Sequence, residues 1–240
     1  MTNTTTYVRP TLFVLSTLAL FFCAVPLLRA HFIWIEVADQ KAYAYFGEGP
    51  DPSTTEMANY LEKLTLHQYT VDGKKSPVAL SLHEAAYRSQ KKITEPTVLG
   101  GSMDWGLFDR AQTKFHLIYH AKHIAAKTET KEEKETFAKL AAATDLPLEI
   151  IPKFDGKDIV FHITYQKKPL SGATIDLITP ELENRSLKTD DQGNATLAVD
   201  QEGLWALRTM TAVTLDENDP RAKEAQEVRH YTTLTLNLTK

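Results

Sequence analysis

The chain has almost no cysteine. Its 240 residues include one, Cys23, which lies inside an apolar N-terminal run. Nothing after that run can form an internal disulfide, an iron–sulfur centre or a cysteine-bound zinc site. All eight histidines lie beyond the run, and they are the informative set of side chains for a binding site.

An excess of charge of one sign is also missing. The 27 basic and 31 acidic side chains give a net charge of −4, without an obvious basic block. This balance argues against a nucleic-acid partner. With 42% hydrophobic and 24% charged residues, the chain is neither wholly disordered nor a fibrous repeat. Its length fits one large domain or two small ones.

Catalytic motifs are absent as well. No Gly-x-Ser-x-Gly turn is present, and Gly100-Gly101-Ser102 does not replace one. His83-Glu84 is followed by Tyr87 where a zinc-protease helix needs its second histidine. There is no phosphate-binding Gly-Lys loop and no dinucleotide fingerprint. We therefore expect a protein that is not an enzyme and has no catalytic residues.

One long hydrophobic run exists, from Leu12 to Val25. Arg9 precedes it, Pro26 follows it, and Ala30 supplies a small residue for cleavage. This order is typical of a secretory signal peptide over residues 1–30, so we expect a periplasmic or secreted protein that begins at His31. The run is short for a membrane span, which leaves none in the mature chain. A retained N-terminal anchor is the alternative.

The remainder is predicted to be mainly β, with two β-sandwich domains joined by a charged helical segment. We expect an N-terminal β-rich domain over 31–124, a helical linker over 125–145 and an immunoglobulin-like sandwich over 146–240. A second helix is predicted over 54–64, capped by Ser53 or Thr54. In the first domain, short segments rich in branched and aromatic residues predict strands at 31–37, 41–46, 64–71, 78–82 and 114–120.

The last ninety or so residues have the clearer rhythm. Ile159, Phe161 and Ile163 alternate with more polar residues, as expected for a half-buried strand. Turn formers such as Asp155-Gly156 separate the segments. Seven short strands over this length are typical of an immunoglobulin-like fold. The predicted strands are 148–152, 158–165, 172–178, 185–189, 194–199, 203–211 and 229–238.

Two resemblances follow from longer stretches of sequence. The segments that begin at Lys168-Pro-Leu-Ser-Gly and at Lys188-Thr-Asp-Asp-Gln-Gly resemble carboxypeptidase-regulatory-like and Cna-B-like β-sandwich modules, which are usually structural. Over about 31–238 the chain resembles a bacterial family of secreted domains described as a periplasmic component of nickel uptake (NikM- or NikK-like). The segments that carry this second resemblance are His31-Phe-Ile-Trp-Ile-Glu, Tyr45-Phe-Gly-Glu-Gly-Pro, Asp104-Trp-Gly-Leu-Phe, Tyr119-His-Ala-Lys, Leu146-Pro-Leu-Glu-Ile-Ile-Pro and Arg229-His-Tyr-Thr-Thr-Leu-Thr-Leu. It implies an exported, two-domain, β-rich protein that handles a transition metal.

His31 is the first candidate metal ligand. Cleavage before it would free an α-amine on the residue that carries an imidazole, and the two nitrogens can chelate one ion in a single ring. Such a site suits Cu²⁺ or Ni²⁺, which accept planar nitrogen donors. The alternative is that His31 is simply the first residue of an edge strand.

Its partners must come from other parts of the chain. The neighbours of His116 and His120 favour a strand, on which these two share a face about 13 Å apart. That is too far for both to bind one ion. We therefore expect His120 to join His31, with His230 as the next candidate.

Two function classes remain. The first is an exported, non-enzymatic protein that binds nickel or copper through His31, His120 and His230, with a membrane metal transporter as a candidate partner. The second is a structural or adhesive β-sandwich module that binds a protein or glycan without metal. A hydrolase ranks last, because no motif supports it.

Overall fold

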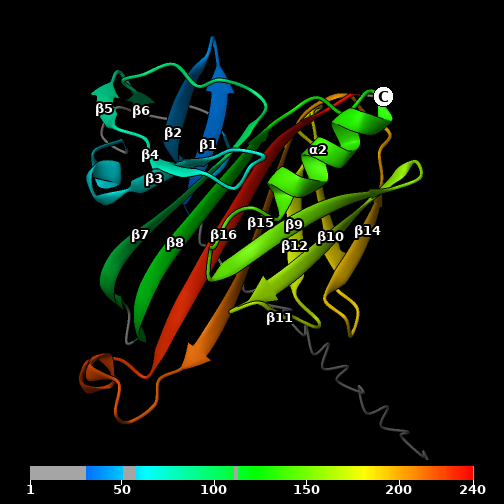
Figure 1. Ribbon diagram of the computed structural model, residues 1–240. Coiled ribbons are helices and arrows are strands. Elements are labelled where there is room, and N and C mark those ends of the chain that lie inside the picture. The colour runs from blue at the N-terminus through cyan, green and yellow to red at the C-terminus, as the bar shows by residue number, and fades with distance from the viewer. Residues whose placement is uncertain (1–30, 51–57, 111–112, 240) are drawn as a thin grey trace, which may run out of the picture.

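The computed structural model describes residues 31–50, 58–110 and 113–239, and a central eight-stranded sheet organises them (Figure 1). The expected signal peptide and Cys23 lie outside the described residues. In spatial order the strands of the sheet are β13 (Asn184–Lys188), β12 (Thr174–Ile178), β15 (Gly203–Thr214), β16 (Glu227–Leu238), β8 (Thr113–Ala125), β7 (Thr97–Arg110), β3 (Thr65–Tyr69) and β4 (Lys75–Pro77). At its centre β16 pairs with β8 in parallel, whereas all the other neighbouring strands of this sheet pair antiparallel.

Successive side chains of a strand point to opposite faces of its sheet. On β8, Tyr119 therefore points to one face and His120 to the other. We call the face that carries Tyr119 the first face and the face that carries His120 the second face. Both faces are covered by a smaller sheet, so both bury apolar side chains.

The first face packs against a four-stranded sheet and a short helix. This sheet consists of β1 (Phe32–Ala38), β2 (Lys41–Gly47), β6 (Ala86–Ser89) and β5 (Leu80–His83), and the 3-10 helix η1 (Asn59–Lys63) lies beside it. Ile33 and Ile35 are fully buried in the same cluster as Leu117 of the central sheet. The hydroxyl of Thr233 on β16 donates to the Ile33 carbonyl over 2.6 Å, which ties the two sheets together.

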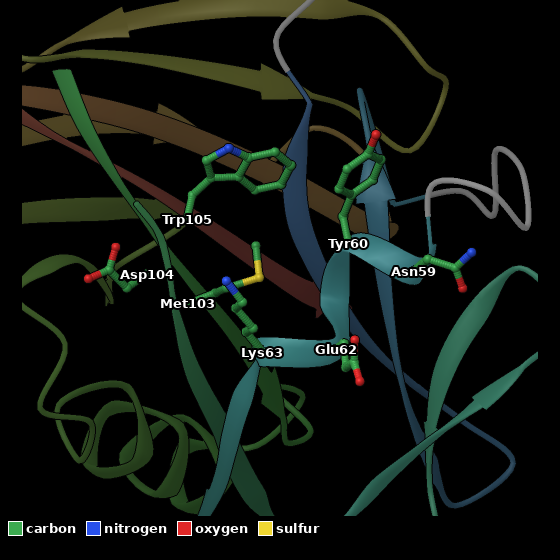
Figure 2. A pocket seen from close by; sticks show the side chains of 7 residues that line it. All are labelled: Asn59, Tyr60, Glu62, Lys63, Met103, Asp104 and Trp105. Carbon is green, nitrogen blue, oxygen red and sulfur yellow. The ribbon is translucent and has the colours of Figure 1, made fainter. Parts of the chain in front are cut away.

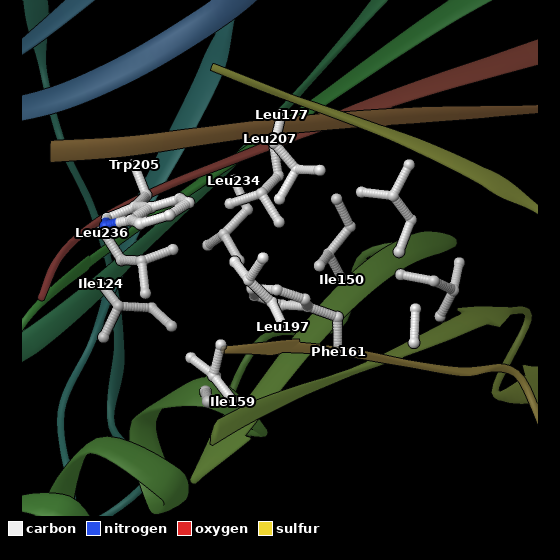
Figure 3. Packing of buried hydrophobic residues seen from close by; sticks show 14 of the residues in the cluster. Ile124, Ile150, Ile159, Phe161, Leu177, Leu197, Trp205, Leu207, Leu234 and Leu236 are labelled. Carbon is white, nitrogen blue, oxygen red and sulfur yellow. The ribbon is translucent and has the colours of Figure 1, made fainter. Parts of the chain in front are cut away.

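The second face packs against the remaining strands. These are β9 (Leu148–Asp155), β10 (Asp158–Tyr165), β11 (Lys168–Pro169) and β14 (Asn194–Ala198). Figure 3 shows Ile159 and Phe161 of β10 directed toward Leu234 and Leu236 of β16. Ile159, Phe161 and Ile163 are all fully buried, so the alternation predicted for this strand is confirmed.

The second face and the strands that cover it form the second sandwich, and the first face and its covering sheet form the first. Helix α2 (Lys131–Ala141) lies against the second sandwich. Thr130 caps it, because its hydroxyl accepts from the Glu133 amide while the Glu133 carboxylate accepts from the Thr130 amide. Phe137 and Leu140 are fully buried in the core of the second sandwich. This helix falls within the linker expected over 125–145, but its apolar side is packed in the core, so the charged helical linker is not confirmed.

The prediction of a mainly β, sandwich-type protein is confirmed. The expected division into two separate β-sandwich domains is revised, because both sandwiches use the same central sheet. Strands β7 and β8 belong to the first expected domain, β15 and β16 belong to the second, and β8 pairs with β16. Two sandwiches lie back to back, and the sheet crosses the expected boundary at 125–145.

The individual strand predictions were mostly correct. All seven expected over 146–240 are present, with small differences at their ends, together with the two-residue β11. The main omission is β7, whose three glycines weaken the strand pattern. Of the helix expected over 54–64, the described part is the short helix η1, and the proposed caps at 53 and 54 lie outside the described residues. In the described part of the chain, no helix is long and apolar enough to cross a membrane.

Candidate functional site

Two of the three predicted ligands meet on the second face. The Nε2 atom of His120 lies 3.1 Å from Nδ1 of His230, across the parallel pair of strands β8 and β16. His230 aligns with Ile118 and His120 with Thr232, so the two imidazoles approach each other diagonally. The expectation that His120 lies on a strand is confirmed.

The rings lie end to end and do not stack face to face. The planes of the two rings differ by 9°. The ring centroids are 5.4 Å apart and the facing nitrogens are 3.1 Å apart, and the difference is about the sum of the two distances from a centroid to its own nitrogen. Both nitrogens therefore lie close to the line that joins the two centroids. This geometry allows one imidazole to donate an N–H to the lone pair of the other.

Hydroxyl groups hold the two outer nitrogens. Ser102 Oγ lies 2.8 Å from Nδ1 of His120, and Tyr165 Oη lies 3.2 Å from Nε2 of His230. The amide of Gln166 donates to Tyr165 Oη over 3.3 Å. Hydrogens can then be assigned in one direction: Tyr165 donates to His230, His230 donates from Nδ1 to His120, and His120 donates from Nδ1 to Ser102.

The pair is buried and uncharged. His120 is 2% exposed and His230 is 7% exposed. Burial, followed by the proximity of His230, lowers the pKa of His120 to about 3. Burial and then the positive charge of Arg221 lower the pKa of His230, while Asp104 acts in the opposite direction. Both rings are therefore neutral at physiological pH, which is the state that binds metal ions.

Charged groups lie near the pair. Arg221, on the 3-10 helix η2 (Pro220–Lys223), forms two hydrogen bonds to Asp219, of 2.9 and 2.7 Å. The hydrogen bonds from Arg221 lower the pKa of Asp219 to about 2. His116 shares the second face, and its Nε2 atom is buried without a hydrogen bond, 3.8 Å from Glu224.

The third predicted ligand, His31, lies on the other side of the central sheet. Its ring stacks on Phe46, with centroids 5.7 Å apart, and Phe46 in turn contacts Tyr119. Since Tyr119 and His120 point to opposite faces, the sheet separates His31 from the histidine pair. The expected site of His31 with His120 is therefore revised to a pair of His120 with His230. His31 directly precedes β1 and is not part of this pair.

His120 and His230 are the two side chains of this site that could hold a metal ion. Each ring offers one nitrogen toward the other, and each outer nitrogen is oriented by a hydroxyl, as is common for metal-bound histidines. Thr232 Oγ1, aligned with His120, is buried without a hydrogen-bond partner. However, no group of three or more His, Cys, Asp or Glu side chains suited to a metal ion occurs among the described residues. The pair can supply at most two side-chain nitrogens to one ion.

Sequence reasoning missed the hydroxyl partners. Ser102 was considered only as part of a failed hydrolase motif, and Tyr165 only as the end of a strand. Sequence reasoning also missed that two segments of the nickel-uptake resemblance meet. Lys122 of Tyr119-His-Ala-Lys and Glu149 of Leu146-Pro-Leu-Glu form a buried ion pair of 2.7 Å. A strand register linking β7, β8 and β16 would have been needed to find these contacts.

A second feature, on the first face, is an aromatic cluster beside a cavity of about 210 Å³ (Figure 2). Trp105 stacks on Tyr60 with centroids 5.1 Å apart, and on Phe46 at 5.5 Å. Tyr60 is 51% exposed. Trp105 is half-buried and lines the cavity. The cavity lining comprises Asn59, Tyr60, Glu62, Lys63, Met103, Asp104 and Trp105.

Comparisons with known proteins give little further information. No family model matches the chain, and no curated protein matches it. The pullulanase of Anoxybacillus sp. LM18-11, solved with maltotriose, aligns with a TM-score of 0.18 and 10% identity, over 75% of this chain and 24% of the enzyme. Pullulanase type I of Bacillus subtilis str. 168, solved with maltose, gives 0.17 and 16% identity, over 75% and 23%. This chain spans about a quarter of their length, and likeness at these scores supports no argument.

Proposed function

We propose that the protein is an exported, non-enzymatic protein that binds a transition-metal ion, copper or nickel, between His120 and His230. The observation that carries this proposal is the facing pair of buried imidazole nitrogens, 3.1 Å apart. Imidazole is a good ligand for both metals. The resemblance to secreted nickel-uptake components supports the same class of function, with a membrane metal transporter as the partner.

The hydrogen-bond network supports a binding role over a purely structural one. Ser102 and Tyr165 orient the outer nitrogens and leave the inner nitrogens facing each other. No carboxylate forms a hydrogen bond with either ring in the described network. An ion that replaced the shared hydrogen would keep Ser102 and Tyr165 as the partners of the outer nitrogens, so the rearrangement would be confined to the two rings and the Tyr165 hydroxyl.

A metal titration tests the proposal. The exported protein is titrated with copper and nickel ions by calorimetry, and the His120→Ala and His230→Ala variants are titrated in parallel. His162→Ala is the matched control, because His162 is a strand histidine that contacts Asn194 in the second sandwich, outside the pair. We expect one ion per chain, lost in both pair variants and retained in the control.

The amine chelate of His31 is tested in the same series. A form with one additional residue before His31 cannot form that chelate. If the extended form loses metal binding while His120→Ala and His230→Ala keep it, the ion is held by His31 on the first face and the proposed site is wrong.

The aromatic cluster favours a second candidate function, a module that binds a glycan. Sugars present apolar C–H faces that pack on aromatic rings, and they present hydroxyls that polar side chains recognise. The cavity combines the rings of Tyr60 and Trp105 with Asn59, Glu62 and Lys63. Screening the protein and its Trp105→Ala variant on a glycan array tests this candidate. Binding that is lost in the variant would support it, and absence of glycan binding by the unmodified protein would refute it.

A further inference from the structure

The geometry points to Cu⁺, held by two imidazole nitrogens in a linear arrangement, as the ion of the histidine pair. This inference deepens the proposed function and rests on it. The first argument concerns direction. Because the two rings lie end to end in nearly one plane, an ion between Nε2 of His120 and Nδ1 of His230 has its two donors on opposite sides.

Donor number separates the candidate ions. Cu²⁺ and Ni²⁺ with nitrogen ligands prefer square-planar or tetragonal sites, and Zn²⁺ prefers four ligands in a tetrahedron. The described residues offer no third His, Cys, Asp or Glu side chain to complete such a set. Cu⁺ has a filled d shell and readily accepts two nitrogens in a line, so the pair satisfies it without further ligands.

Charge favours the same ion. The cost of transferring an ion from water into a protein rises with the square of its charge, so a dication is penalised about four times as much as a monocation. Both rings are neutral donors, each at least nine-tenths buried. The positive charge of Arg221 acts on His230, and the negative charge of Asp104 opposes it more weakly. A single positive charge is therefore much easier to place here than a double one.

The rings must separate slightly to admit the ion. Bonds from imidazole nitrogen to these metals are about 2 Å long, so a linear site places the nitrogens about 4 Å apart. The present distance of 3.1 Å must increase by about 1 Å. The strand pairing of β8 with β16 fixes the backbones, so this movement falls to the side-chain torsions of the two histidines.

The protons balance without net release. His120 keeps its hydrogen on Nδ1, bonded to Ser102. His230 loses the hydrogen on Nδ1 to solvent and takes one up on Nε2, where it donates to Tyr165 Oη. The Tyr165 hydroxyl then turns its own hydrogen away. Tyr165 is thus a positioning residue, which holds the tautomer of His230 that the ion requires.

The test compares ions on protein that carries one additional residue before His31, so that the terminal chelate is absent. Under anaerobic conditions, Cu⁺ is titrated in competition with a chromogenic Cu⁺ chelator, and Cu²⁺ and Ni²⁺ are titrated separately. X-ray absorption of the Cu⁺ form counts the ligands. His120→Ala and His230→Ala remove the donors, Tyr165→Phe removes the positioning hydroxyl, and His162→Ala is the control.

We expect one Cu⁺ per chain with two nitrogen ligands, at an affinity at least 100-fold above that for Ni²⁺, where a hundredfold corresponds to about 2.7 kcal/mol. Both pair variants should lose the ion. Tyr165→Phe should weaken binding by about 10-fold with thermal unfolding unchanged. Tighter binding of Cu²⁺ or Ni²⁺ at the same histidines would overturn the inference and leave the proposed function standing. Absence of binding by every ion would overturn both.

Discussion

The buried pair of Lys122 and Glu149 allows a quantitative prediction about how the second sandwich is held together. Lys122 Nζ donates to Glu149 Oε1 over 2.7 Å, to the Ile150 carbonyl over 3.2 Å and to the Ala141 carbonyl at the end of α2. The Thr144 hydroxyl also donates to Glu149. The side chains are 1% and 8% exposed. One ammonium group therefore links the central sheet, α2 and β9.

Removing one partner leaves the other charge buried. We expect Lys122→Met to lower the free energy of unfolding by about 3–5 kcal/mol. The double variant Lys122→Met with Glu149→Leu should recover most of this loss, because apolar pairs of similar volume replace buried ion pairs at little cost. Urea unfolding of the single and double variants gives the coupling free energy directly.

The matched control is the exposed pair of Lys75 and Asp145, whose side chains are 42% and 60% exposed at 3.0 Å. Lys75→Met should cost about 0–1 kcal/mol. If Lys122→Met costs no more than this control, the ammonium is not buried as described and the reasoning fails.

Three further predictions concern pH, packing and domain organisation. Burial lowers the pKa of His123 from 6.5 to about 4, so between these two pH values the unfolded chain binds a proton that the folded chain does not. The free energy of unfolding that depends on His123 should be complete above pH 6.5 and fall by about 1.4 kcal/mol per pH unit toward pH 4. Urea unfolding of His123→Asn should show a shallower decline over the same range. A Cβ at position 101 would lie 2.9 Å from the Thr65 carbonyl oxygen, so Gly101→Ala should destabilise the protein by about 1–3 kcal/mol, whereas Gly49→Ala, with its nearest contact at 3.4 Å, should be nearly neutral in thermal unfolding. The fragment 146–240 lacks strand β8 and helix α2, so it should show no cooperative transition by circular dichroism while 31–240 does; a cooperative fragment would contradict the shared core.

The sequence pattern was sufficient for those strands whose apolar residues alternate. The sequence predicted β10 because its apolar residues alternate with more polar ones. The apolar residues that point into the core are Ile159, Phe161 and Ile163. Strand β7 escaped prediction because Gly100 and Gly101 stand where β3 and Thr144 approach too closely for a side chain. Such close approaches are set by tertiary packing, which local patterns do not contain.

The candidate site could be predicted only in part for a related reason. His120 and His230 stand 110 positions apart, and their meeting depends on the parallel register of β8 with β16. Nothing local indicates that register. His31 lies on the opposite face because the small sheet that begins with β1 covers the first face. Long-range packing, and no local pattern, determines which face that sheet covers.

The central claim is that a metal ion binds between His120 and His230, and anomalous diffraction tests it most directly. Crystals of the exported protein are soaked in copper or nickel, and data are collected on both sides of the absorption edge of the metal. The account predicts one anomalous peak per chain, between Nε2 of His120 and Nδ1 of His230, which vanishes in His230→Ala crystals. A peak at His31 on the first face, or no ordered peak at either place, would contradict it.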